Sequence, residues 1–100
     1  GYKFDSKLEA ARYKQLKLME SAGELSHLEL QPKYPCEVNG KKICTYIADF
    51  RYQLKNGDTV VEDVKGVETA VFKLKKKLVE SLYPGVKIQI VKNPRFFVVS

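Results

Sequence analysis

Two carboxylates and a lysine in the middle of the chain have the residue types and spacing of a metal-dependent hydrolytic site. Asp49 comes late in a run of β-branched and aromatic residues, and Asp63 and Lys65 form an Asp-x-Lys triplet at the end of the next run. Phosphodiester hydrolysis needs a hard cation that neutralises developing charge and supplies hydroxide near neutral pH. Carboxylate oxygens are suitable ligands for Mg²⁺ or Mn²⁺, and the Val64 carbonyl can add a third oxygen. A lysine at this spacing can orient the attacking water, so the pattern predicts a nuclease site.

The hairpin between the two runs decides whether these side chains meet. A two-residue turn at 56–57 would set Asp49 opposite the residue after Asp63 and scatter the site. A three-residue loop at 55–57, with Gly57 in the left-handed position, instead sets Asp49 directly opposite Asp63. The motif lysine then shares their face, because side chains alternate along a strand. Glycine at the third loop position favours this second register, which we expect.

An amphipathic helix is expected from Asp5 or Ser6 to about Ala22, ending at Gly23. The sequence 6–9 fits a capping box, with Phe4 as a hydrophobic staple. Its apolar stripe, with Glu9 at the margin, comprises Leu8, Ala11, Leu18, Met19 and Ala22, widened by Leu16.

A second helix is expected from Val67 to about Tyr83. Its predicted apolar stripe comprises Val67, Val71, Leu74, Leu78 and Leu82. A lysine cluster lies outside this stripe, and it suits either a solvated face or contact with phosphates: Lys73, Lys75, Lys76 and Lys77.

The strands complete an α+β domain that spans residues 1–100. We expect a half-buried strand at 25–31, a turn region at 35–40 with a reversal at Asn39-Gly40, and one long strand at 43–54. A strand at 59–65 follows, and a right-handed crossover would lay 86–91 parallel to it. The prediction is a mixed β-sheet, with antiparallel strands plus a parallel βαβ crossover, flanked by two helices. Residues 96–99 can extend an edge or pack on the core.

The charge composition of the chain indicates what kind of partner it binds. The 18 Lys and Arg against 12 Asp and Glu give a net charge of +6, which favours a polyanion such as DNA. No signal peptide or membrane-length apolar run is visible, so a cytoplasmic protein is expected. Cys36 and Cys44 lack metal or redox spacing and are predicted to be free thiols. His27 is the one histidine, expected to be solvent-facing or locally bonded, and no organic cofactor is expected.

The chain resembles the PD-(D/E)xK nuclease superfamily, and more closely an uncharacterised phage-encoded branch of it. The resemblance is carried by residues 4–10, 30–32, 46–50, 61–66 and 72–75. The layout is similar to that of transposon end-cleaving and junction-resolving nucleases. The resemblance implies a restriction-endonuclease-like fold and a role in phage DNA processing or recombination, in the cytoplasm of a bacterial host.

The resemblance also implies roles for single residues. Glu9 would join Asp49 and Asp63 around Mg²⁺ or Mn²⁺, with Lys65 as the motif lysine. Residues expected near the DNA are Lys73, Lys75, Lys76 and Gln31. Two positions depart from the commoner pattern: Ala48 stands where proline is usual, and Asp63 replaces glutamate. Because Glu62 directly precedes Asp63, a local bulge could transfer the metal-binding role to Glu62.

A rival hypothesis is a basic αβ module that binds nucleic acid or a protein without cutting. Tyr46, Phe50 and Tyr52, at alternating positions, would then form a stacking platform, and Asp49 and Asp63 would lie in solvent. Under the nuclease hypothesis, one active centre per chain would require a homodimer to cut both strands of a duplex.

Overall fold

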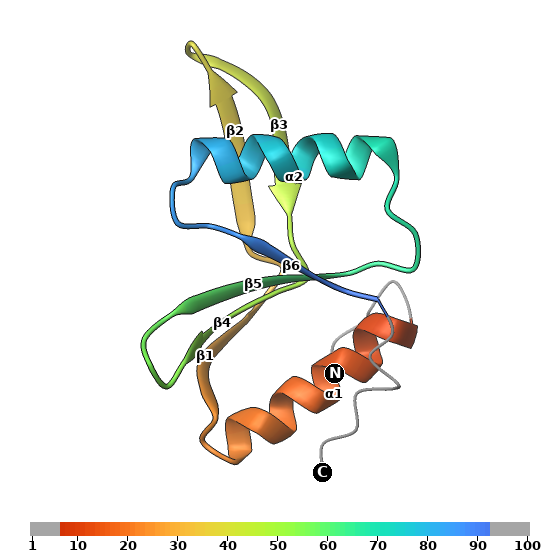
Figure 1. Ribbon diagram of the computed structural model, residues 1–100, viewed down its shortest axis with the longest axis vertical. Helices are drawn as coiled ribbons and strands as arrows, with labels where there is room; N and C mark the ends of the chain where they lie inside the picture. Colours follow the sequence, from red (N-terminus) through yellow and green to blue (C-terminus); the bar gives the residue numbers. More distant parts are fainter. Residues whose placement is uncertain (1–6, 93–100) are drawn as a thin grey trace.

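The computed structural model of the protein describes residues 7–92, which form a mixed β-sheet between two helices (Figure 1). The elements in chain order are α1 (Lys7–Ser21), β1 (Leu25–Leu30), β2 (Lys33–Val38), β3 (Lys41–Ile47), β4 (Phe50–Leu54), β5 (Thr59–Val64), α2 (Ala70–Leu82) and β6 (Ile88–Val91). Four strands are arranged in the order β1-β4-β5-β6; β4 is antiparallel to β1 and β5, and β6 is parallel to β5. The predicted α+β class and parallel βαβ crossover are confirmed.

Helix α1 ends where the sequence predicts. Gly23 has a φ of +78°, and the Glu24 N–H donates to the Met19 carbonyl at 2.9 Å, which satisfies a carbonyl of the last turn. The predicted apolar stripe is partly wrong, because Leu18 is 67% exposed while Leu16 is fully buried. The predicted capping box and the Phe4 staple depend on residues outside the described range.

The inward face of α1 contains a charged residue, Arg12. Its presence there explains why the buried face of α1 differs from the predicted apolar stripe. Leu8, Leu16 and Met19 pack against the sheet on the same side as the Arg12 guanidinium, which binds Glu62 of β5. A prediction from apolar spacing alone passes over this position, since it assumes that charged side chains face water.

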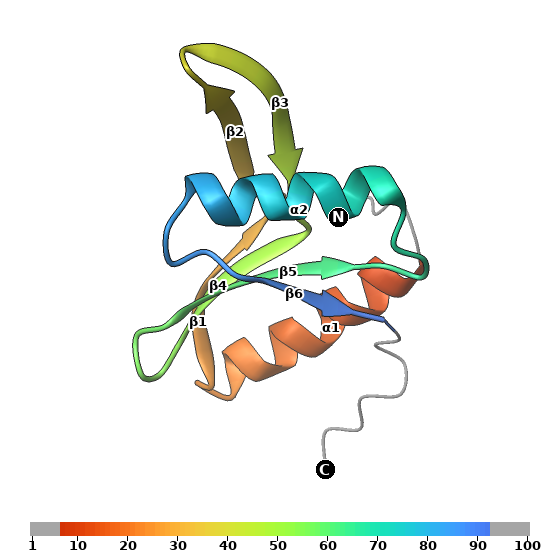
Figure 2. The same cartoon turned by 45° about the horizontal axis from the view of Figure 1, so that its top comes forward.

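Strands β2 and β3 form a separate two-stranded sheet that projects beyond α2 (Figure 2). The reversal at Asn39 and Gly40 is confirmed; both have positive φ, 51° and 78°, as a two-residue type I′ loop requires. The predicted turn region 35–40 is otherwise wrong, because β2 continues to Val38. Pro35 is tolerated there because a two-stranded sheet has only edge strands.

The predicted single strand 43–54 is two strands, with a break at Ala48 and Asp49. β3 pairs with β2, whereas β4 pairs with β1 and β5, so the chain changes sheets at the break. Ala48 is fully buried there, and the Asp49 side chain binds the β5 backbone. Local β propensity continues through the break, which is why the sequence conceals it.

Helix α2 starts later than predicted, because Thr69 is its N-cap and accepts a hydrogen bond from the Phe72 N–H at 3.1 Å. Its buried side is centred on Phe72 and Val79, so the predicted stripe is rotated from the true one. Val71, expected to be buried, is 62% exposed. Val67 and Leu74 are exposed as well.

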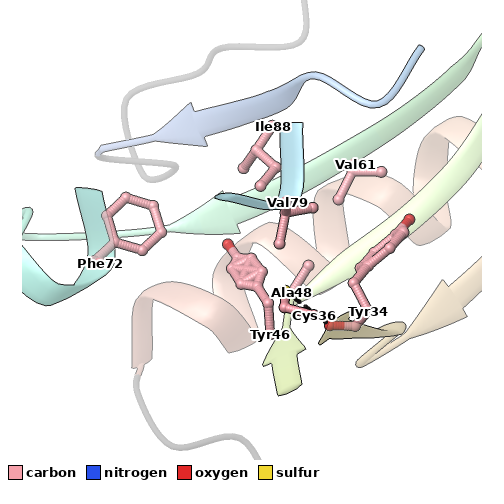
Figure 3. Close-up of a cluster of buried hydrophobic side chains, with 8 residues drawn as sticks. All are labelled: Tyr34, Cys36, Tyr46, Ala48, Val61, Phe72, Val79 and Ile88. Carbon is pink, nitrogen blue, oxygen red and sulfur yellow. Dashed lines mark hydrogen bonds between the residues drawn. The ribbon is translucent and has the colours of Figure 1, made fainter. Parts of the chain in front are cut away.

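Helices α1 and α2 cover opposite faces of the four-stranded sheet (Figure 1), and a hydrophobic cluster lies under each of them. Under α1, Leu16 packs with Phe50 and Val64. The cluster under α2, shown in Figure 3, comprises Tyr34, Cys36, Tyr46, Ala48, Val61, Phe72, Val79 and Ile88. Across residues 7–92 no helix has the length and apolar character needed to cross a membrane. The expectation that residues 96–99 extend an edge or pack on the core concerns residues outside this range.

The two thiols and the histidine agree with the sequence prediction. Cys36 and Cys44 are both free thiols. They lie at opposite positions of the β2–β3 hairpin, in the same register pair. His27 is exposed in β1, where its ring lies 3.1 Å from the Ser26 hydroxyl.

Candidate active site

The β4–β5 hairpin has the register that brings the two predicted aspartates together. Gly57 has a φ of +93°, and the Leu54 N–H donates to the Asp58 carbonyl at 2.9 Å, which closes a three-residue loop. The pairs run without interruption from 53↔59 to 50↔62. The predicted hairpin register is confirmed over these pairs, and Asp49, directly before Phe50, lies at the Asp63 end of β5.

Asp49 is fixed in the bend before β4 by contacts at both its backbone and its side chain. Its N–H donates to the Glu62 carbonyl at 3.1 Å, and its Oδ2 accepts a hydrogen bond from the Val64 N–H at 2.7 Å. In an antiparallel ladder the N–H and C=O of one residue point to the same neighbouring strand, so the Val64 carbonyl also faces the Asp49 side. The carboxylate is thereby held at the end of β5.

Asp63 is the most unusual group of the site. Its side chain is 1% exposed, and neither carboxylate oxygen has a hydrogen-bond partner in the described range, residues 7–92. Burial raises its pKa to about 6, although the positive charge of Lys65 and the nearby Asp49 backbone N–H, which is too poorly placed for a regular hydrogen bond, oppose the shift. An isolated buried carboxylate is costly unless a cation or a donor compensates it, and such groups concentrate at functional sites.

Lys65 lies on the same face as Asp63, as strand alternation predicts. Its Nζ is 4.0 Å from Asp63 Oδ1 and 4.7 Å from the centre of the Phe72 ring. The ring supports the ammonium group by a cation–π contact while about a third of the side chain remains exposed. The lysine therefore lies between the buried carboxylate and solvent.

Glu62 points to the opposite face of β5, where both of its carboxylate oxygens are occupied. Arg12 Nε and Nη2 donate to Oε1 and Oε2 at 2.8 and 2.7 Å, and the Tyr52 hydroxyl also donates to Oε2. Burial, followed by the hydrogen bond to Glu62, raises the pKa of Tyr52. Because the β4–β5 pairing has no bulge, the alternative in which Glu62 replaces Asp63 has no structural support.

The structure does not bring Glu9 into one group with Asp49 and Asp63. Glu9 is half-buried on α1, which covers the Glu62 face of the sheet, whereas Asp63 points to the α2 face. Within residues 7–92, no three His, Cys, Asp or Glu side chains gather as ligands for one ion. Because α1 and the Asp-x-Lys triplet lie on different sides of β5, the role of Glu9 as a third ligand stays a prediction.

The predicted DNA-contacting residues are at different distances from this pair. Lys75 is half-buried and lines a cleft that it shares with Lys65. Lys73 is exposed, and Lys76 forms an ion pair with Glu80 at 3.2 Å. Gln31 lies next to the site through its backbone, since its N–H donates to the Asp49 carbonyl at 2.9 Å. Its side chain is exposed.

The family model described as protein of unknown function (DUF1064) matches residues 1–97. The chain belongs to this family. Comparison with curated proteins and with solved structures yields no match. Since the description of the DUF1064 family gives no activity, function must be inferred from the chemistry of the site.

The prediction from sequence missed one feature of this DUF1064 protein, the buried ion pair between Arg12 and Glu62. Arg12 interrupts an apolar stripe at four-residue spacing from Leu8 and Leu16, and this interruption was the available signal for a buried ion pair. The aromatic stacking platform of the rival hypothesis is wrong, because these side chains are buried. Phe50 and Tyr52 lie under α1, and Tyr46 lies under α2.

Proposed function

We propose that this protein is a Mg²⁺- or Mn²⁺-dependent DNA endonuclease of the PD-(D/E)xK type that acts in phage DNA processing. The observation that supports the proposal best is the Asp63 carboxylate, which is buried and without a hydrogen-bond partner among the described residues. It lies beside Asp49 and 4.0 Å from Lys65. A buried ion pair with a purely structural role is stable only when hydrogen bonds also satisfy its oxygens, and the Asp63 oxygens receive none from the described residues.

The donor set fits a hard divalent cation. Asp49 and Asp63 supply carboxylate oxygens, and the Val64 carbonyl points to the same side. A bound Mg²⁺ or Mn²⁺ would neutralise phosphate charge and lower the pKa of a water molecule. The three residues would hold the ion, and Glu9 is left out of the set.

The side chains around the pair have separate roles in this proposal. Lys65 would orient the attacking water and offset negative charge at the phosphate, since its ammonium group is partly exposed and supported by Phe72. The hydrogen bond from Val64 fixes the Asp49 carboxylate in advance, so little reorganisation is needed. A net charge of +6 favours approach of DNA.

The test is cleavage of supercoiled plasmid and of a synthetic four-way junction by wild type, Asp63→Asn and Asp58→Asn. Asp58 is an exposed aspartate in the hairpin loop and serves as the matched control. Cleavage should require Mg²⁺ or Mn²⁺, stop with EDTA, fall by about a hundredfold or more in Asp63→Asn and persist in Asp58→Asn.

Cleavage that continues in EDTA, or that survives in Asp63→Asn, would overturn the proposal. DNA binding without any cleavage by wild type would instead favour the non-catalytic module. Analytical ultracentrifugation with and without DNA would show whether the active species is a homodimer.

A further inference from the structure

A cleft of about 330 Å³ opens between α2 and β3, next to Lys65. Its walls come from β3, from the end of the Asp-x-Lys triplet and from the first half of α2: Thr45, Tyr46, Ile47, Lys65, Thr69, Val71, Phe72 and Lys75. None of these residues belongs to the Asp49–Asp63 pair, and Lys65 links the cleft to that pair. The cleft therefore extends the active site in one direction, over the α2 face of the sheet.

The polar groups of this cleft are mainly donors. Tyr46 is 4% exposed, and its hydroxyl has no hydrogen-bond partner within the described part of the chain. Figure 3 shows its ring pointing from β3 toward α2, between Phe72 and Val79. Lys65 and Lys75 add two ammonium groups, and no acidic residue is among the lining residues of the described cleft. This chemistry favours an anion.

The remaining wall is apolar and partly open to solvent. Ile47 is 51% exposed and Val71 is 62% exposed, and the Phe72 ring lies behind them. A free inorganic anion would gain nothing from these side chains. A nucleotide would use both parts of the cleft, since its phosphate suits the donors and its base and sugar suit the apolar wall.

We infer that the α2–β3 cleft binds the phosphate and base of one unpaired nucleotide. This nucleotide would lie next to the phosphodiester whose hydrolysis Lys65 assists. In a continuous duplex the bases are stacked and only their edges are accessible in the grooves, so no base face could contact the apolar wall. The substrate class is accordingly DNA with an unpaired nucleotide beside the cut, as at a flap or an overhang. This inference rests on the proposed nuclease function and specifies its substrate.

The experiment measures binding, so that its result is separable from cleavage. Fluorescence anisotropy in EDTA would compare a blunt duplex with the same duplex carrying a single-stranded flap, using Asp63→Asn as the parent protein. Tyr46→Phe and Lys75→Gln would be introduced into this parent. Lys76→Gln is the matched control, because Lys76 neighbours Lys75 but pairs with Glu80 outside the cleft.

The parent should bind the flapped duplex about tenfold more tightly than the blunt one. Tyr46→Phe and Lys75→Gln should each remove most of this preference and leave blunt-duplex affinity within about twofold, because each removes one hydrogen bond to a charged group. Lys76→Gln should keep the preference. Equal affinity for the two DNAs, or a preference that both cleft variants retain, would overturn the inference. If the preference holds while wild type cleaves nothing, the nuclease proposal fails and the cleft remains a nucleotide-binding site.

Discussion

Glu62 and Asp63 are consecutive residues of β5, both almost completely buried, yet among the described residues only Glu62 accepts hydrogen bonds from other side chains. Glu62 points toward α1 and accepts hydrogen bonds from Arg12 and Tyr52, whereas Asp63 points toward α2 and receives none from the described residues. Strand alternation places the two side chains on opposite faces of the sheet, and the residues that folding brings to each face produce the contrast. One carboxylate therefore stabilises the docking of α1, and the other is the one that we propose binds a cation.

Removal of Arg12 should destabilise the protein strongly. Arg12→Met leaves the buried Glu62 charge without its main partner, and losses of about 3–5 kcal/mol are typical of such a change. Lys14→Met, at an exposed position of the same helix, should alter the free energy of unfolding by less than about 0.5 kcal/mol. Urea denaturation measures both. A loss in Arg12→Met no larger than in Lys14→Met would show that the ion pair contributes little.

Two buried tyrosines should respond differently to loss of the hydroxyl. Tyr52→Phe removes a donor from the buried Glu62 and should cost about 1–3 kcal/mol. Tyr46→Phe removes a hydroxyl without a hydrogen-bond partner in residues 7–92 and should be neutral or slightly stabilising. Thermal unfolding followed by circular dichroism would rank the two variants. A larger loss in Tyr46→Phe would contradict the assignment of partners.

The stability of the metal-free protein should fall as pH rises through the titration of Asp63. Its folded-state pKa is raised to about 6 by burial, above an unfolded value of about 3.9, so the native state binds the extra proton between these values. The resulting stabilisation is complete below the unfolded pKa and is lost above the folded one. Between pH 5 and pH 7.5 the loss should be roughly 1 kcal/mol.

Asp63→Asn should lack this pH dependence, since it cannot ionise. Urea unfolding of both proteins in EDTA, at pH 5 and pH 7.5, gives the difference directly. At pH 7.5 the variant should be more stable than wild type. A variant that loses stability at pH 7.5 would mean that the Asp63 charge is compensated in the native state.

Two glycines, one in the β4–β5 loop and one shortly after β5, should differ in their tolerance of a side chain. Gly57 has a φ of +93°, so Gly57→Ala should cost about 1–2 kcal/mol and weaken the hairpin register. Gly66 has no positive φ and no atom within 4 Å of an added Cβ, so Gly66→Ala should leave stability almost unchanged. Chemical denaturation tests both. Equal losses of unfolding free energy in the two variants would show that the positive φ of Gly57 does not limit the choice of residue there.

The sequence by itself determined the features that depend on neighbouring residues. Gly23 ends α1, Gly57 sets the hairpin loop, and alternation then places Asp49 beside Asp63 with Lys65 on the same face. These outcomes follow from backbone sterics and from a side-chain period of two, which act within a few residues. The positions of the two proposed metal ligands were predictable for this reason.

Only the tertiary structure decided which faces are buried and which charges are paired. The rotation of α1 depends on the bond between Arg12 and Glu62, fifty residues apart, and the break at Asp49 depends on β3 and β4 joining different sheets. The same distant packing sets α1 and the Asp63 side chain on opposite faces of β5 and leaves Asp63 buried without a hydrogen bond from residues 7–92. Local spacing cannot predict such pairings, since the energy of a buried charge depends on groups that folding brings from elsewhere in the chain.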